Sequence, residues 1–182
     1  MSLLRRIRQF FYRRSLNNTV AREQRNHQTI TFKQARTAGV LFYADKPADT
    51  QLLQQYVKQL EQRGLKVQHL TFIKEKKQAE QYKQPHFTKK DINFFGVPKG
   101  DAVAHFSRQP FDLLINLYLT DNQALEYISA VSAARYRVGR VVADKTWYCD
   151  LMVNLGEKRE LPYLIRQIDH YLNYINTDAK AV

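Results

Sequence analysis

The chain has 182 residues, of which 44% are hydrophobic and 12% aromatic, and it contains one cysteine, Cys149. This length predicts one compact domain, and the apolar content excludes global disorder and a fibrous repeat. A lone cysteine can form neither an intrachain disulfide nor a four-cysteine zinc site, so a reducing compartment, the cytoplasm, is expected. No apolar run reaches the roughly 18 residues that a membrane-spanning helix needs, and the start of the chain lacks the apolar stretch of a secretory signal.

The net charge of +12 is concentrated at the N-terminus. Residues 1–36 hold nine basic residues and one acidic residue, Glu23, so this segment carries +8. The other 146 residues hold 20 basic and 16 acidic residues, a net charge of +4. We therefore divide the chain into a basic arm, residues 1–36, and a single domain, residues 37–182.

The arm begins with the periodicity of an amphipathic helix. Leu3, Leu4, Ile7, Phe10 and Phe11 follow the intervals of one helix face. The end of the arm, residues 29–32, has the composition of a short strand. Basic and aromatic side chains fill much of the remaining helix surface, namely Arg5, Arg6, Arg8, Tyr12, Arg13 and Arg14.

Strand and helix patterns then alternate along the domain. Four segments have apolar residues at helical spacing, and Gly64 marks the end of the first of them. The segment 74–90 is polar and lysine-rich and predicts a solvated loop. The predicted strands are 40–44, 67–73, 92–95, 111–119, 136–142 and 149–155, and the predicted helices are 48–63, 101–106, 124–134 and 161–175.

This alternation predicts an α/β fold with a mostly parallel sheet covered on both faces. The nearest architecture is a three-layer Rossmann-like or flavodoxin-like sandwich. Residues 111–119 are apolar on both faces, so we expect this strand at the centre of the sheet.

Two strands repeat a pattern, with Asp112 and Asp150 at their starts and an asparagine four residues later. Parallel sheets collect ligands beyond the carboxyl ends of their strands, so polar residues there are candidates for a small-ligand crevice. The favoured alternative is that they satisfy neighbouring loops and bind nothing. The candidates are Asn116, Tyr118, Thr120, Asp121 and Asn154.

Cofactor and catalytic motifs are missing from the sequence. The loop 96–100 lacks the glycine spacing and the Gly-Lys-Ser/Thr ending of a phosphate loop, and no candidate first strand leads into G-x-G-x-x-G. The five histidines form no metal-binding spacing, and Cys149 is expected to be a core residue. We expect no cofactor, no metal and no catalytic residues, and we favour a binding protein over an enzyme.

Two resemblances support this interpretation. The segments 94–100, 111–118 and 136–140 resemble an uncharacterised family, a domain of unknown function found in Bacteroidota, over residues 39–176. The resemblance implies a bacterial cytoplasmic protein and supplies no activity. Residues 112–139 are also similar to the strand–helix–strand unit in the N-terminal half of heptosyltransferase-like glycosyltransferases. Those enzymes hold the sugar nucleotide mainly in a second domain, so this similarity supports the fold and argues against the reaction.

Three partners fit the arm. Its arginines could neutralise phosphates of RNA or the ribosome while its aromatic residues stack on bases, with Arg135, Arg137 and Arg140 extending the surface. The same apolar stripe could instead dock on a protein, either its own domain or a second copy. A peripheral contact with an anionic membrane is the third alternative.

Overall fold

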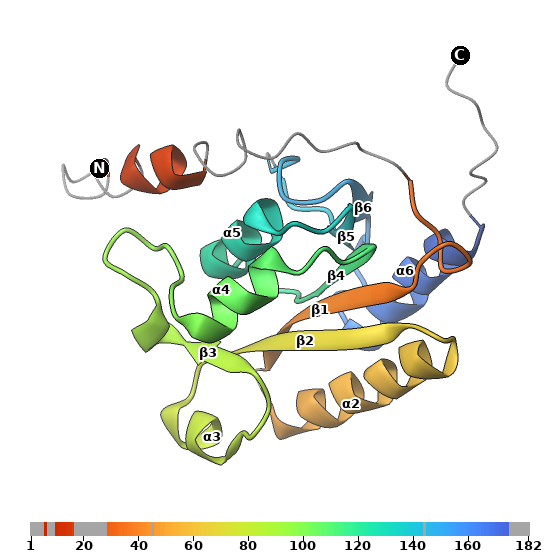
Figure 1. Ribbon diagram of the computed structural model, residues 1–182, viewed down its shortest axis with the longest axis horizontal. Helices are drawn as coiled ribbons and strands as arrows, with labels where there is room; N and C mark the ends of the chain where they lie inside the picture. The colour runs from red at the N-terminus through yellow and green to blue at the C-terminus, as the bar shows by residue number, and fades with distance from the viewer. Residues whose placement is uncertain (1–5, 7–9, 17–28, 45, 144, 175–182) are drawn as a thin grey trace.

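The computed structural model describes residue 6 and residues 10–16, 29–44, 46–143 and 145–174. Six strands form one parallel sheet in the order β3-β2-β1-β4-β5-β6 (Figure 1). The predicted α/β class is therefore confirmed, and this strand order is that of Rossmann-type doubly wound sheets. The strands are β1 (Thr37–Ala44), β2 (Lys66–Ile73), β3 (His86–Thr88), β4 (Leu113–Leu117), β5 (Tyr136–Arg140) and β6 (Leu151–Val153).

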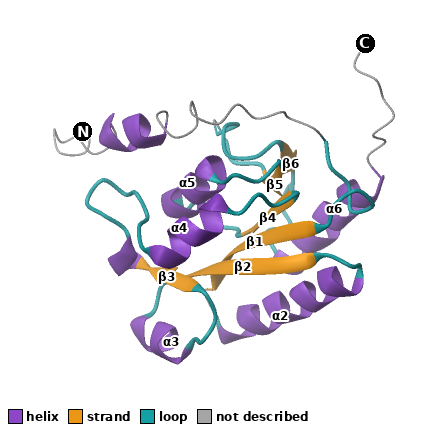
Figure 2. Ribbon diagram, viewed as in Figure 1, coloured by secondary structure: helices purple, strands orange, loops and turns teal. Residues whose placement is uncertain are grey.

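Helices cover both faces of the sheet and make a three-layer arrangement (Figure 2). One face packs on α2 (Pro47–Gln62) and α6 (Leu161–Tyr174), and the other packs on α4 (Asp101–Arg108) and α5 (Gln123–Val131). A short helix, α3 (Lys76–Gln81), and a 3₁₀ turn, η1 (Lys89–Asp91), flank β3 at the edge of the sheet.

The strand β4 lies between β1 and β5, as its apolar sequence predicts. Its side chains alternate between two buried clusters, since Leu113 and Ile115 belong to the cluster under α2 and α6 while Leu114 belongs to the cluster under α4 and α5. All five residues of the strand are buried. A strand apolar on both faces can satisfy both helical layers only from the interior of a sheet.

Local signals account for the ends of the helices. Gly64, at φ +88°, follows α2, and its N–H donates to the carbonyl of Glu61 (2.8 Å), which is the left-handed stop that the sequence predicts. At the start of α5 the side chain of Asn122 accepts from the N–H groups of Ala124 and Leu125 (3.1 and 3.2 Å).

Two predicted strands are wrong. In the segment 92–95 only Ile92 makes an isolated bridge, to Pro98, and the following residues turn. The third strand is instead β3, inside the segment that the sequence indicates as a loop. Residues 29–32 also form no strand, because Thr31 starts a turn in which its N–H and its hydroxyl donate to the side chain of Gln34.

Candidate nucleic-acid interface

The helix that includes residues 10–16 packs on α5 of its own domain. Tyr12 and Leu16, one helical turn apart, are buried in the same cluster as Tyr127. The hydroxyl of Tyr12 donates to the carbonyl of Gln123 (3.0 Å), and the hydroxyls of Ser15 and Tyr127 lie 2.7 Å apart. Burial, with Glu126 and Tyr127 nearby, raises the pKa of Tyr12. The face that anchors this helix is therefore defined by Tyr12 and Leu16.

This docking corrects the expected role of one of the three aromatic residues, Tyr12. Tyr12 is 4% exposed and cannot stack on an external base, whereas Phe10 (59%) and Phe11 (44%), expected on the apolar face, are exposed. The remaining members of the predicted stripe, Leu3, Leu4 and Ile7, lie outside the described residues, as do Arg5 and Arg8.

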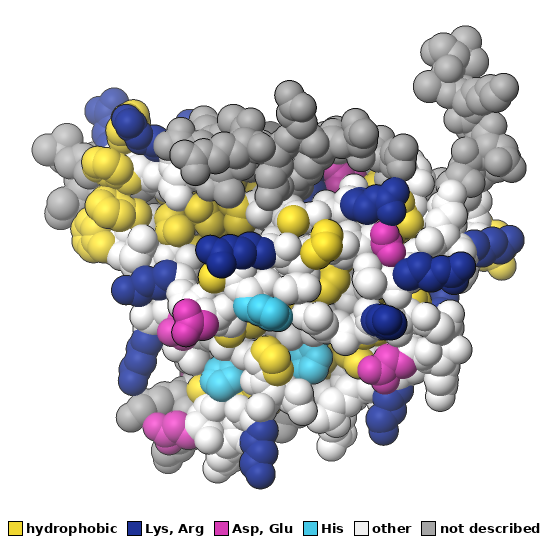
Figure 3. Space-filling view, viewed as in Figure 1, with side chains coloured by type: hydrophobic (Ala, Val, Ile, Leu, Met, Phe, Trp, Pro, Cys, Tyr) yellow, Lys and Arg dark blue, Asp and Glu magenta, His cyan; other side chains and the backbone are white. Residues whose placement is uncertain are grey.

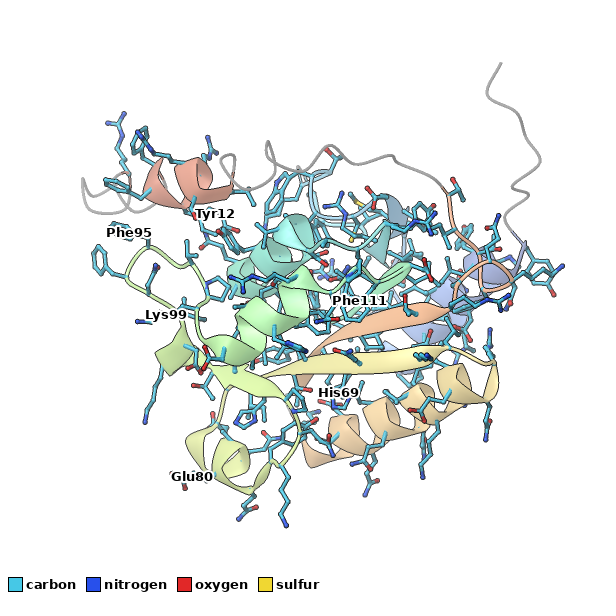
Figure 4. The ribbon with its side chains drawn as sticks, viewed as in Figure 1. Tyr12, His69, Glu80, Phe95, Lys99 and Phe111 are labelled. Carbon is cyan, nitrogen blue, oxygen red and sulfur yellow. The ribbon has the colours of Figure 1, made fainter. Side chains whose placement is uncertain are left out.

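Phe10 and Phe11 belong to a continuous row of four exposed or half-buried rings. The centroids of Phe10 and Phe11 are 5.6 Å apart, those of Phe11 and Phe95 are 4.8 Å apart, and those of Phe95 and Phe94 are 5.6 Å apart. Phe94 is 66% exposed. This Phe row, defined as Phe10, Phe11, Phe94 and Phe95, joins the arm to the loop between η1 and α4. Figure 3 shows a yellow patch at the upper left, in the region where Figure 4 labels Phe95.

Hydrogen bonds inside the loop hold Phe94 and Phe95 in place. The side-chain oxygen of Asn93 accepts from the N–H groups of Phe95 and Val97 (both 3.0 Å), and the N–H of Asn93 donates to the carbonyl of Val97 (2.9 Å). Gly96, at φ +86°, closes the turn. An asparagine that bonds its own backbone in this way fixes the loop, so the two rings point outward without a partner strand. Figure 4 shows Phe95 beneath the helix that carries Tyr12, with Lys99 further along the loop.

Cations border the Phe row. Arg6, Arg13 and Arg14 of the arm are exposed, and Lys99 is exposed at the end of the loop. Figure 3 shows Lys and Arg side chains around the yellow patch. Exposed aromatic rings next to cations are the components with which proteins hold single-stranded nucleic acid.

The three arginines expected to extend this surface are engaged within the domain. Arg137 is buried and makes a bidentate pair with Asp150 (Nε–Oδ2 3.0 Å, Nη2–Oδ1 2.7 Å). Arg135 pairs with Asp112 (2.9 Å), and Arg140 pairs with Asp121 (2.5 Å). Burial of the Arg137 and Arg140 side chains, 6% and 12% exposed, corrects the prediction for these two, whereas Arg135, 53% exposed in its ion pair, stays a prediction.

The carboxyl ends of β1 and β4 border a hollow that only two of the five predicted crevice residues line. A cavity of about 520 Å³ lies there and includes Tyr118 and Thr120 with Lys46, Asp49 and Glu160. The two carboxylates against one lysine disfavour a phosphate, and Asp49 already accepts from the backbone N–H of Lys46 (2.9 Å) at the start of α2. This crevice therefore lacks the chemistry of a nucleotide site.

The other three crevice candidates lie elsewhere. Asn116 is buried and donates to the carbonyl of Val138 (3.1 Å) and to the sulfur of Cys149 (3.4 Å). Asp121 holds Arg140, and the side chain of Asn154 accepts from the N–H of Gly156 (3.0 Å). These residues hold strands and turns, as the alternative interpretation expects.

The single cysteine of the chain is not activated as a nucleophile. Cys149 is buried, and burial raises the pKa of its thiol, so the thiolate that a nucleophile requires is disfavoured. Across the described part of the chain, no cluster of three or more His, Cys, Asp or Glu side chains could hold a metal ion.

The interface residues that sequence reasoning misses are Phe94, Phe95 and Lys99. The sequence places Phe94 and Phe95 in a strand of a sheet covered on both faces, which would bury both rings, although the Gly96-Val97-Pro98 turn follows them directly. That pair of rings before a turn was the available signal.

The described residues thus form a Rossmann-type α/β domain, and the helix of residues 10–16 packs on one of its helical layers. The chain belongs to a family of unknown function, DUF6913, whose model matches residues 8–175. No curated protein and no solved structure matches the chain. The family match begins inside the arm, so it includes the helix that carries Tyr12 and Leu16.

Proposed function

We propose that this protein is a non-catalytic RNA-binding protein of the bacterial cytoplasm that holds a single-stranded segment across the Phe row. The observation that carries this proposal is the contact between Phe11 and Phe95, which joins arm and loop into one aromatic surface. Bases would stack on the exposed rings while phosphates meet the five arginines of residues 5–14 and Lys99.

The energetics favour an external partner for these rings. Leaving large aromatic side chains in water forgoes the free energy of burial, and Phe10 and Phe94 are more than half exposed. Stacking of one base on one aromatic ring contributes about 1–3 kcal/mol to binding. The fixed turn at Asn93 presents two of the rings without a conformational cost on binding.

The membrane alternative is weaker on geometric grounds, whereas the helix of residues 10–16 packs on α5 of its own domain through Tyr12 and Leu16. An interfacial helix lies on a membrane through its apolar face, but Tyr12 and Leu16 of this helix face α5. In the described part of the chain, no helix is both long and apolar enough to cross a membrane.

Single-stranded RNA binding by ring-deletion variants tests the proposal. In filter binding with oligouridylate, Phe10→Ala and Phe94→Ala should each weaken binding by about 1–3 kcal/mol if the ring stacks on a base. The matched control is Tyr174→Ala, which removes a 75% exposed aromatic ring from α6, at the other end of the molecule in Figure 1. Equal losses in all three variants, or none, would contradict the proposal.

The salt dependence of RNA binding separates the contribution of the cations from that of the aromatic rings. Six phosphate contacts, one for each of the five arginines of residues 5–14 and one for Lys99, give a slope of log affinity against log salt near −4 for a single strand. The double variant Arg13→Ala/Arg14→Ala should reduce this slope by about 1.4, whereas Phe94→Ala should leave it unchanged.

Flotation with anionic vesicles is run on the same proteins. Vesicle binding that needs Phe10 and Phe94, without RNA binding, would replace RNA by a membrane as the partner.

A further inference from the structure

The outer edge of β2 is open over its first half. This strand pairs with β1 from Lys66 to Ile73, but it pairs with β3 only from Thr71 to Ile73. The N–H of Thr71 donates outward to the carbonyl of Pro85 (3.1 Å), and that of Lys66 donates inward to Arg36 (2.8 Å). Alternate residues of a parallel strand face the same neighbour, so Val67 and His69 direct their N–H and C=O groups to the open side.

Pro85 explains why the ladder stops. The next bond between β3 and β2 would run from the N–H of residue 85 to the carbonyl of His69, and proline has no N–H. Nothing in the described ranges hydrogen-bonds to Val67 or His69 on this outer side. The N–H and C=O groups of Val67 and His69 are therefore open to hydrogen bonds from an added strand.

A groove of about 1170 Å³ runs along this open edge. One wall is formed by Val57, Lys58 and Glu61 of α2 and the other by Ala102 and Phe106 of α4. Three histidines also line it, His69, His86 and His105, and His side chains gather at the middle of the face in Figure 3.

His69 provides a second, independent observation. Its Nε2 atom is buried and has no hydrogen-bond partner among the described residues. Burial also lowers the pKa of His69, which favours the neutral ring. Figure 4 shows His69 below β2, on the side of α2. A buried ring nitrogen without a partner, in the same groove as unpaired backbone groups, indicates a polar occupant.

We propose that this groove binds an extended peptide segment of a partner protein, which adds a strand beside β2. Peptide side chains would alternate between the two walls, with apolar residues toward Ala102 and Phe106 and polar residues toward Lys58 and Glu61. A second copy of this chain is disfavoured, because its own β2 edge lies between its own α2 and α4 and cannot enter a groove walled by helices. The proposal does not depend on RNA binding.

Amide hydrogen exchange tests the geometry directly. In the free protein, the N–H groups of Val67 and His69 should exchange quickly, while those of Gln68 and Leu70, which face β1, should be protected. Bound peptide should slow Val67 and His69 by about tenfold or more and leave Gln68 and Leu70 unchanged. Uniform protection of all four amides in the free protein would show that the edge is already paired.

Two neighbouring glutamines of α2 provide matched variants for the binding test. Gln54 lines the groove and Gln55 does not, although both are exposed, so Gln54→Trp should fill the groove while Gln55→Trp leaves it open. A phage-displayed library of random linear peptides, each about a dozen residues long and so longer than a typical strand, is selected on the intact protein. Selected peptides should bind Gln54→Trp about tenfold or more weakly and bind Gln55→Trp normally.

Methylation of peptide nitrogens identifies the binding mode. In a selected peptide, N-methylation at alternate positions should abolish binding, and methylation at the positions between them should not, because only alternate N–H groups face β2. The proposal is overturned if no peptide is selected, if Gln54→Trp binds equally well, or if all methylated positions behave alike. A dimer in sedimentation that Gln54→Trp converts to a monomer would assign the groove to a second copy instead.

Discussion

The two aspartates that start the repeated strands tie neighbouring strands together. Oδ2 of Asp112 accepts from the backbone N–H groups of Arg36 and Thr37 (2.8 and 3.1 Å), at the start of β1. Asp150 accepts from the backbone N–H of Arg137 (2.8 Å) as well as from its guanidinium. Both carboxylates lie at the amino ends of strands, opposite the usual ligand side of a parallel sheet, so their role is structural.

At the scale of a residue, the buried ion pair of Arg137 and Asp150 leads to a prediction about the free energy of unfolding. Arg137→Met should lower the free energy of unfolding by about 3–5 kcal/mol, because it leaves a buried carboxylate without its cation. Urea unfolding followed by circular dichroism measures the loss. The matched control is Arg135→Met, whose guanidinium is half exposed in its pair with Asp112, and which should cost less than about 1 kcal/mol. Similar losses for both variants would show that burial does not distinguish the pairs.

Docking of the N-terminal helix makes a prediction at the scale of an element. Tyr12→Ala should lower the free energy of unfolding by about 3 kcal/mol, since it removes a buried ring and the bond to Gln123. Phe10→Ala, on the exposed face of the same helix, should change it by less than about 0.5 kcal/mol. Urea unfolding of both variants checks the difference. An equal, small effect would mean that this helix contributes nothing to the stability of the domain.

The same comparison separates the roles of the two aromatic residues in binding. Tyr12→Ala should weaken RNA binding only by releasing the helix from α5, so RNA binding and stability fall together. Phe10→Ala should weaken RNA binding while stability is kept, since its ring faces solvent.

At the scale of the whole molecule, the switch point of the sheet is expected to hold no nucleotide and no metal. The strand order reverses between β1 and β4, where related sheets bind nucleotides, but here Asp49 and Glu160 line the cavity. The sequence also has no glycine-rich phosphate-binding loop after β1. Protein purified from cells should therefore release no nucleotide on acid denaturation and show no stoichiometric metal by elemental analysis. One equivalent of either per chain would refute this prediction.

The sequence by itself determined the fold class and the central strand, because both depend on local periodicity. Residues 111–119 are apolar on both faces, which is compatible only with an interior strand, and Gly64 ends α2 through its own backbone freedom. It also determined where the positive charge lies, since charge is a sum over residues.

Only the tertiary structure decided which side chains face outward. Five apolar residues of the arm share one helical face by spacing. The two of them that the structure describes, Phe10 and Phe11, are exposed, whereas the domain buries Tyr12 and Leu16 because α5 presents Tyr127 to that side. Arg137 looked like a surface cation until the fold placed Asp150 against it. The contact of Phe11 with Phe95 and the open edge at Val67 and His69 join residues far apart in the chain. Such contacts depend on how the layers and strands pack in three dimensions, and local sequence patterns do not determine that packing.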